Sequence, residues 1–131
     1  MKSLMDKLIF IIDDDPFWTA ILTQHLNEMG YANIKTFESG ELASAEITSN
    51  PDLVFLDFQL GSEDGLDVLQ QIKGYNPGIG VIFCTGYEDL GVAISAMEYG
   101  SLDYLLKGNA SKEVVGKIMA SLSRNRAFQA F

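Results

Sequence analysis

The sequence has little positive charge, only three prolines and a single cysteine. Nine lysines and arginines stand against 18 aspartates and glutamates, which gives a formal net charge of −9. A protein that binds nucleic acid directly must neutralise phosphates with basic side chains, so this deficit argues against such a partner. Cys84 has no second cysteine to pair with, which excludes an internal disulfide and favours a reducing compartment.

Long apolar runs are absent as well. None approaches the roughly 20 residues that a membrane-spanning helix needs, and residues 1–7 lack the apolar core of a signal peptide. We therefore expect a cytoplasmic protein with no membrane partner. The length of 131 residues and the hydrophobic content of 47% fit one globular domain. We expect a single domain over residues 1–131, with a core from about 7 to 124 and a C-terminal tail over 125–131 for which the sequence predicts no particular structure.

Four short, mainly apolar runs and one more polar short strand over residues 33–37 alternate with stretches in which apolar residues recur at helical spacing. Runs without polar alternation are typical of strands buried on both faces of a parallel sheet, and helical crossovers join such strands. The sequence therefore predicts an α/β fold of the flavodoxin-like (βα)5 type, a five-stranded parallel sheet with strand order 2-1-3-4-5. The predicted strands cover residues 8–12, 33–37, 52–56, 79–84 and 102–106.

Local signals indicate where several helices begin and end. Asp15 followed by Pro16 is typical of an N-cap and the first residue of a helix, and Gly30 is expected to end that helix. A second helix is predicted over residues 41–48. Residues 58–64 are predicted to form a loop.

Polar side chains follow four of the five predicted strands. Asp13 and Asp14 follow the first strand, Asp57 the third, Thr85 the fourth and Lys107 the fifth. In this strand order these four ends are neighbours, so the side chains should meet in one crevice at the carboxyl edge of the sheet. Such a crevice is where α/β proteins bind ligands.

This set of side chains suits a divalent cation and a phosphoryl group. Carboxylates on strands about 4.8 Å apart repel by about 3 kcal/mol at an effective dielectric near 20. A hard cation with oxygen ligands would offset that repulsion, and Lys107 adds a positive charge. A metal, a lysine and a hydroxyl around a carboxylate can position a phosphoryl group, and the carboxylate itself can be the nucleophile.

Four motifs at these strand ends resemble the receiver domain of two-component response regulators. Each motif is weak by itself, but together, in order and at the ends of the correct strands, they are highly specific. The resemblance covers the chain from residue 8 to about 122. The motifs are Ile-Ile-Asp-Asp-Asp at 11–15, Asp-Leu-Val-Phe-Leu-Asp at 52–57 with Asp-Gly-Leu at 64–66, Cys-Thr-Gly at 84–86, and Gly-Ser-Leu-Asp-Tyr-Leu-Leu-Lys at 100–107.

The resemblance implies a phosphoacceptor and a metal site. Asp57 would take a phosphoryl group from a histidine kinase or phosphotransfer protein. Asp14 and Asp57 would bind Mg²⁺ together with the backbone carbonyl of Gln59, and Asp13 would reach the ion through water. The protein would then phosphorylate and dephosphorylate only itself, as a switch rather than a turnover enzyme.

The resemblance also implies how the switch would work. Thr85 and Lys107 would hold the phosphoryl oxygens, and Tyr104 would turn inward when Thr85 moves toward the phosphate. The surface that changes would be the fourth helix, the fifth strand and the fifth helix. In this family that face usually binds an effector protein or a second copy of the domain.

Two positions depart from the common pattern of the family. Lys107 is followed by Gly108 rather than proline, so a cis bond after it cannot be assumed. The usual proline in the loop after the acceptor is replaced near Gly61. Gln59 and Tyr87 occupy positions that tune phosphoryl lifetime in the family.

Other functions remain open from the residues. Asp13 and Asp15 have the spacing of a haloacid-dehalogenase-like phosphohydrolase, with Asp13 as nucleophile, but that family needs a further acidic pair after the lysine, and Asp57 would go unused. A flavodoxin-like cofactor binder is disfavoured because three carboxylates would repel an anionic cofactor. A receiver used only for docking, without phosphorylation, is the third alternative.

Overall fold

The computed structural model of the protein describes residues 3–86 and 90–124. Two of the expectations above, the role of Tyr87 and the tail over 125–131, lie outside the described residues. The helices, with 3₁₀ turns labelled η, are η1 Leu4–Asp6, α1 Pro16–Glu28, α2 Gly40–Ser44, η2 Ile47–Ser49, α3 Gly65–Tyr75, α4 Leu90–Glu98, η3 Lys107–Asn109 and α5 Lys112–Arg124. The strands are β1 Leu8–Ile12, β2 Asn33–Phe37, β3 Leu53–Asp57, β4 Gln59–Leu60, β5 Glu63–Asp64, β6 Gly80–Thr85 and β7 Asp103–Leu106.

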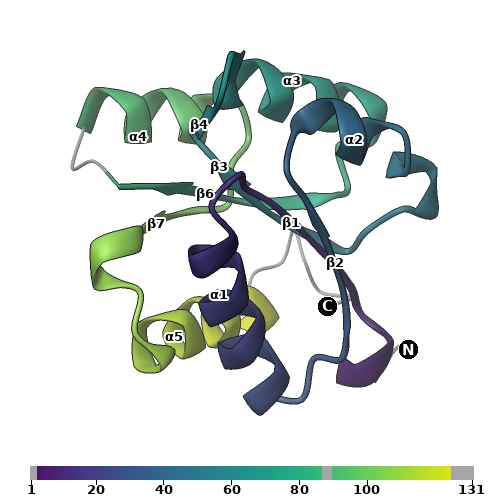
Figure 1. Ribbon diagram of the computed structural model, residues 1–131, viewed down its shortest axis with the longest axis vertical. Helices are drawn as coiled ribbons and strands as arrows, with labels where there is room; N and C mark the ends of the chain where they lie inside the picture. Colours follow the sequence, from purple (N-terminus) through teal and green to yellow (C-terminus); the bar gives the residue numbers. More distant parts are fainter. Residues whose placement is uncertain (1–2, 87–89, 125–131) are drawn as a thin grey trace.

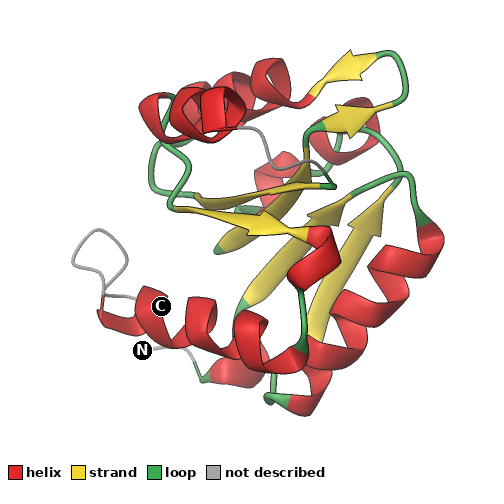
Figure 2. Ribbon diagram, turned by 90° about the vertical axis from the view of Figure 1, so that its left-hand side faces the viewer, coloured by secondary structure: helices red, strands yellow, loops and turns green. Residues whose placement is uncertain are grey.

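The main sheet confirms the predicted topology. Its five strands are parallel and lie in the order β2-β1-β3-β6-β7, while β4 and β5 form a separate hairpin. Counted without that hairpin, the order is the predicted 2-1-3-4-5. The hairpin stands apart from the main sheet in Figure 2.

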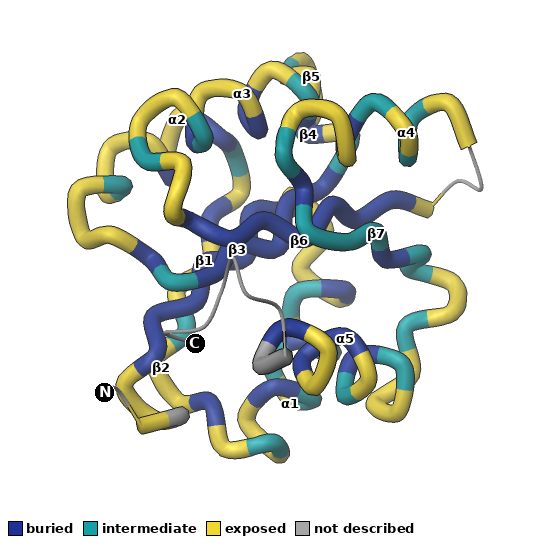
Figure 3. The backbone as a smooth tube through the Cα atoms, turned by 180° about the vertical axis from the view of Figure 1, so that it is seen from behind, coloured by how far each residue is buried: buried dark blue, intermediate teal, exposed yellow. Residues whose placement is uncertain are grey.

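Helices cover both faces of the sheet. In Figure 1, α2, α3 and α4 lie on one face, while α1 and α5 lie on the other. Alternate residues of β1 serve the two layers, since Ile9 and Ile11 pack with α1 and α5, and Phe10 and Ile12 pack with the opposite layer. The central strands are accordingly buried along their length, as the dark tube of Figure 3 shows.

The local signals for α1 are confirmed. The Asp15 carboxylate accepts hydrogen bonds from the backbone N–H groups of Phe17 and Trp18, and Pro16 is the first helical residue. The helix ends at Glu28, and Gly30 has a φ of 102°, a left-handed conformation that glycine adopts without steric cost.

Two local predictions were wrong. The helix expected over residues 41–48 is divided into α2 and the 3₁₀ turn η2, because the backbone changes to shorter hydrogen-bonded turns, such as Glu46 N–H to the Ala43 carbonyl. The stretch expected to be a loop over 58–64 contains the β4–β5 hairpin, where Gln59 pairs with Asp64 and Leu60 pairs with Glu63. Short-range pattern does not reveal strands of two residues.

Among residues 3–86 and 90–124, no helix is both long and apolar enough to cross a bilayer. No described peptide bond is cis, so the bond between Lys107 and Gly108 is trans.

Candidate functional site

The carboxyl edge of the sheet brings the predicted polar residues together. Asp57 and Thr85 are the last residues of β3 and β6, while Asp13 and Lys107 directly follow β1 and β7. A cleft of about 940 Å³ opens here. Its lining includes Asp14, Asp15, Asp57, Phe58, Gln59, Gly61, Ser62, Glu63, Asp64, Thr85, Gly86 and Lys107.

Three carboxylates converge at one side of the cleft. Oxygen atoms of Asp13, Asp14 and Asp57 all lie within 4.8 Å of one another. Asp13 and Asp57 are buried, and Asp14 is exposed. Within the described part of the chain, this is the group of acidic side chains placed to hold a metal ion.

Lys107 lies between two of these acids. Its Nζ is 2.7 Å from Oδ2 of Asp13 and 3.3 Å from Oδ1 of Asp57. The same ammonium lies 5.6 Å from the ring centroid of Trp18, within the range of a cation–π contact. Burial opposes the charge on Lys107, but the two carboxylates outweigh it and hold the pKa of Lys107 above its ordinary value.

The two buried acids are still short of positive charge. Burial, and after it the charge of Asp13, raises the pKa of Asp57 to about 6 against the opposing effect of Lys107. Burial also raises the pKa of Asp13, although Lys107 and the backbone N–H of Asp15 work to lower it. One ammonium therefore does not compensate the cluster, and a further cation would be bound favourably here.

The hydroxyl and the aromatic residue predicted for the switch lie on adjacent strands. Thr85 is buried, with 2% of its surface exposed, and lines the cleft. Tyr104 is half-buried, pairs with Phe83 in the β6–β7 register and packs against the core layer under α2, α3 and α4. The structure thus brings Thr85 to the site and Tyr104 to its neighbouring strand, and their roles stay a prediction.

Gln59 begins the hairpin beside the cleft. Its side chain is exposed, and its backbone N–H acts on the Asp57 carboxylate to lower the pKa of Asp57, against the larger effect of burial. The backbone on this side is held close by Gly65, where an added Cβ would lie 2.5 Å from the Asp57 carbonyl oxygen and 2.7 Å from that of Phe58. A glycine is required at this point because no side chain fits against that backbone.

Sequence reasoning missed two residues of the site, Trp18 and Glu63. Trp18 is a buried residue of α1, and nothing in the helical spacing of its apolar residues shows that Lys107 lies beside its ring. Glu63 lines the cleft and binds the backbone of α2. No local signal could reveal that contact, because the partners are 23 residues apart.

The geometry does not favour the alternative that uses Asp13 as nucleophile. The Asp13 carboxylate is buried and engaged by Lys107 and by the Asp15 N–H. The Asp15 side chain, which a phosphohydrolase of that type would need as an acid, caps α1.

Comparison with known proteins decides the family. The sequence model of the response regulator receiver domain family matches residues 9–119 of this chain. The chain belongs to this family. It is thus the receiver domain of a two-component response regulator.

Named relatives of the receiver domain are longer regulators. NtrC of Klebsiella pneumoniae, a DNA-binding transcriptional regulator, is 36% identical over 117 residues, which are 88% of this chain and 25% of NtrC. The transcriptional regulatory protein ZraR of Escherichia coli is 36% identical over 100 residues, 76% of this chain and 22% of ZraR. The chain therefore spans about a quarter of the length of the curated relatives it matches.

A solved structure of similar size supports the fold. The receiver domain of NtrX from Brucella abortus superposes with a TM-score of 0.81 at 26% identity, covering 94% of this chain and 99% of that domain. The flavodoxin-like architecture of this receiver domain is therefore shared with solved members of the family.

Proposed function

We propose that this receiver domain accepts a phosphoryl group on Asp57 in a Mg²⁺-dependent step and acts as a switch, not as a turnover enzyme. The observation that carries the proposal is a buried carboxylate whose pKa is raised to about 6, with Lys107 3.3 Å away and two further acids within 4.8 Å. Such a carboxylate lies where a cation and a phosphoryl group would both be stabilised.

The residues present fit magnesium. Asp14 and Asp57 offer carboxylate oxygens, the Gln59 backbone offers a carbonyl at the same cleft, and Asp13 would act through water. Hard oxygen donors of this kind select Mg²⁺ over softer metals. When bound, the ion supplies positive charge that neutralises phosphoryl oxygens.

The chain's own residues account for the transfer step. An Asp57 carboxylate oxygen attacks the phosphorus of a phosphohistidine, the new O–P bond forms, and the P–N bond to the imidazole breaks with the electron pair staying on nitrogen. Lys107 neutralises phosphoryl oxygens, and the Thr85 hydroxyl donates a hydrogen bond to one of them. Burial of Asp57 keeps competing water from much of its surface.

The partners follow from this step. The phosphoryl donor would be a histidine kinase or a phosphotransfer protein, and the output would pass through the α4, β7 and α5 face to an effector protein or a second copy. With a net charge of −9, direct binding to nucleic acid is not expected. With such partners, the domain would act in the cytoplasm.

Thr85 and Tyr104 would couple the site to that face. The added group carries roughly −1.5 to −2 charges by analogy with other phosphorylated side chains, enough to shift a two-state loop. We expect Thr85→Ala to lose most of the phosphorylation-dependent change around the Tyr104 ring, followed by NMR. A full change in that variant would contradict the coupling.

The central test is a titration with acetyl phosphate or beryllofluoride in the presence of Mg²⁺. Mass spectrometry should locate the adduct on Asp57, thermal stability should rise, and Asp57→Asn should show neither effect. Label on Asp13 would favour the phosphohydrolase instead. Failure to bind Mg²⁺ would favour a receiver used only for docking.

A further inference from the structure

We propose that Glu63 is a positioning residue that fastens the β4–β5 hairpin to α2 and thereby fixes the backbone of Gln59 at the phosphoacceptor. The inference rests on the proposed function for its effect on the metal, but the clamp itself is a property of the folded chain. It adds a residue outside the expected set of site residues.

The contact joins two segments that are distant in sequence. Oε1 of Glu63 accepts a hydrogen bond of 2.8 Å from the backbone N–H of Gly40, and Oε2 accepts one of 3.1 Å from that of Glu41. Both N–H groups belong to the first turn of α2, where helix N–H groups have no partner within the helix. A carboxylate is the acceptor favoured there, because bonds to a charged group are the stronger ones.

The anchor point on α2 is itself fixed. A Cβ added to Gly40 would lie 2.6 Å from Cγ2 of Val68 and 3.1 Å from Oε2 of Glu63, so α2 begins in close contact with α3 and with the hairpin. The backbone N–H of Leu42, in the same first turn, donates a hydrogen bond of 3.1 Å to the Ser39 hydroxyl. Glu63 therefore binds a helix end that is closely packed and capped.

The hairpin needs such an anchor. Its strands have two residues each, a length that is not stable alone. Its turn contains Gly61 at a φ of +65°, in open space. Leu60 is buried and holds one strand in the core, but the carboxylate of Asp64 is engaged in capping α3. Asp64 thus ties the second strand to α3, and Glu63 supplies its link to α2.

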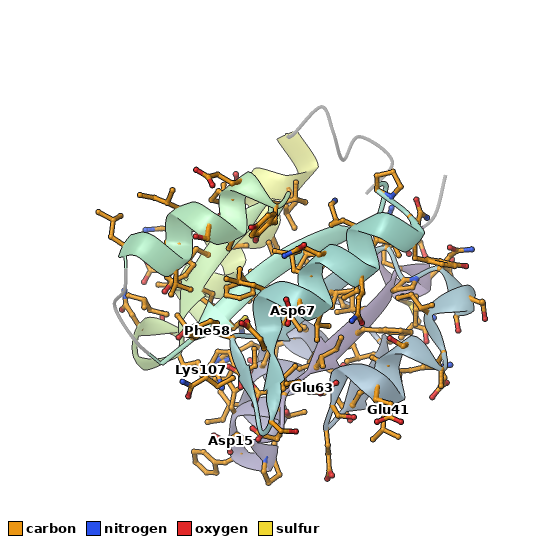
Figure 4. All side chains as sticks on the ribbon, turned by 90° about the horizontal axis from the view of Figure 1, so that it is seen from above. Asp15, Glu41, Phe58, Glu63, Asp67 and Lys107 are labelled. Carbon is orange, nitrogen blue, oxygen red and sulfur yellow. The ribbon has the colours of Figure 1, made fainter. Side chains whose placement is uncertain are left out.

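The clamp acts on the site through the paired strand. Glu63 lies opposite Leu60 in the hairpin register, one residue from Gln59, which directly follows β3 and Phe58 and lines the cleft beside Asp57. In Figure 4, Lys107 is seen on one side of the hairpin, and Glu63 lies on the other side, toward Glu41 of α2. Releasing Glu63 would let the Gln59 backbone move relative to Asp57, which affects both its N–H and the carbonyl proposed to bind the metal.

The test compares Glu63→Ala with Ser39→Ala in the full chain. Ser39→Ala removes the other cap of the same helix without touching the hairpin, and Glu41→Gln removes a neighbouring charge. We expect Glu63→Ala to shift the Gln59 amide resonance and to speed hydrogen exchange at the Gly40 and Glu41 amides in metal-free protein. It should weaken Mg²⁺ binding roughly tenfold, the low end for a group that orients a metal ligand.

The controls separate this role from simple loss of stability. Ser39→Ala should lower the melting temperature because it removes a helix cap, yet its Mg²⁺ affinity should stay within about twofold of wild type. Glu41→Gln should likewise keep its Mg²⁺ affinity within about twofold. Glu63→Gln, which keeps one acceptor oxygen, should be intermediate and gives the answer if Glu63→Ala does not fold. An unchanged Gln59 resonance and unchanged Mg²⁺ affinity in both Glu63 variants would overturn the inference alone. A wild-type domain that binds no Mg²⁺ would overturn the proposed function. The change of the Gln59 amide resonance in metal-free Glu63→Ala would still test whether Glu63 positions the hairpin.

Discussion

At the scale of single residues, the site is an uneven balance of charge. Lys107 contacts both Asp13 and Asp57, yet the pKa of each acid is raised because burial outweighs that one ammonium. A buried acid held in this state lowers stability in exchange for reactivity and cation binding. The metal-free domain should therefore be less stable than a variant in which an uncharged side chain replaces the buried acid.

Asp57→Asn tests this balance. Because the pKa of Asp57 is raised to about 6, the folded protein binds its proton more tightly than the unfolded chain does. The free energy of unfolding should then fall as pH rises from about 4 to about 6 and stay low above, by up to roughly 3 kcal/mol. After loss of the Lys107 contact is allowed for, we expect Asp57→Asn to gain about 1–2 kcal/mol near neutral pH in metal-free buffer.

Urea denaturation across this pH range measures the effect. The gain should shrink toward pH 4, where the wild-type carboxyl is already protonated in the folded protein. Asp67→Asn, which removes an exposed acid from the first turn of α3, is the matched control and should show no such gain. A variant that is less stable than wild type at neutral pH would show that Asp57 is already compensated.

At the scale of elements, the β3–α3 connection decides the geometry of the acceptor. The Phe58 N–H binds the Cys84 carbonyl, the Gly65 N–H binds the Phe58 carbonyl, and the Asp64 side chain caps α3. Together with the hairpin, these bonds leave the backbone after Asp57 little freedom. Close packing of α3 on that backbone is possible only because Gly65 has no side chain.

Gly65→Ala should therefore damage both stability and the site. The new Cβ would lie 2.5 Å from the Asp57 carbonyl oxygen, a backbone atom that cannot move without displacing the acceptor. We expect a loss of about 2 kcal/mol or more in unfolding free energy, and weaker beryllofluoride binding. Gly74→Ala in the same helix meets nothing within 4 Å and should be neutral or stabilising by up to about 1 kcal/mol. Equal melting temperatures for the two variants would contradict the close approach.

At the scale of the whole molecule, the excess of acidic residues sets the response to salt. The net charge of −9 repels itself in the compact state, and the Debye length falls to about 10 Å near 0.1 M salt. Ion pairs such as Lys112 with Glu28 are exposed and contribute little to stability, so their screening by salt should lower the free energy of unfolding only slightly.

Added NaCl should therefore raise the melting temperature. From about 20 to about 200 mM NaCl we expect an increase of roughly 2–4 °C, followed by circular dichroism. MgCl₂ at equal ionic strength should raise it further in wild type but not in Asp57→Asn, because only specific binding depends on that acid. A melting temperature that falls with NaCl would mean that attractive ion pairs outweigh the net repulsion.

Much of the fold and site could be predicted because the responsible signals are local or periodic. Uninterrupted apolar runs indicated buried parallel strands, Asp15 and Pro16 indicated the start of α1, and the order of strands then placed Asp13, Asp57 and Lys107 at one edge. Two features were not predicted, because one or two hydrogen bonds decide them: the division of the helix after Ser44, and the hairpin formed by Gln59–Leu60 and Glu63–Asp64.

The sequence by itself thus determined which strands form and which end of the sheet carries the acids, since burial on both faces and chain order leave few other arrangements. Tertiary structure alone decided the charge state and the fine geometry. In the folded chain, Asp13 and Asp57 are buried around Lys107, and Trp18 lies beside that ammonium. Glu63 accepts hydrogen bonds from the backbone of α2. Desolvation and contacts between distant segments exist only once the chain is packed, and no local pattern encodes them.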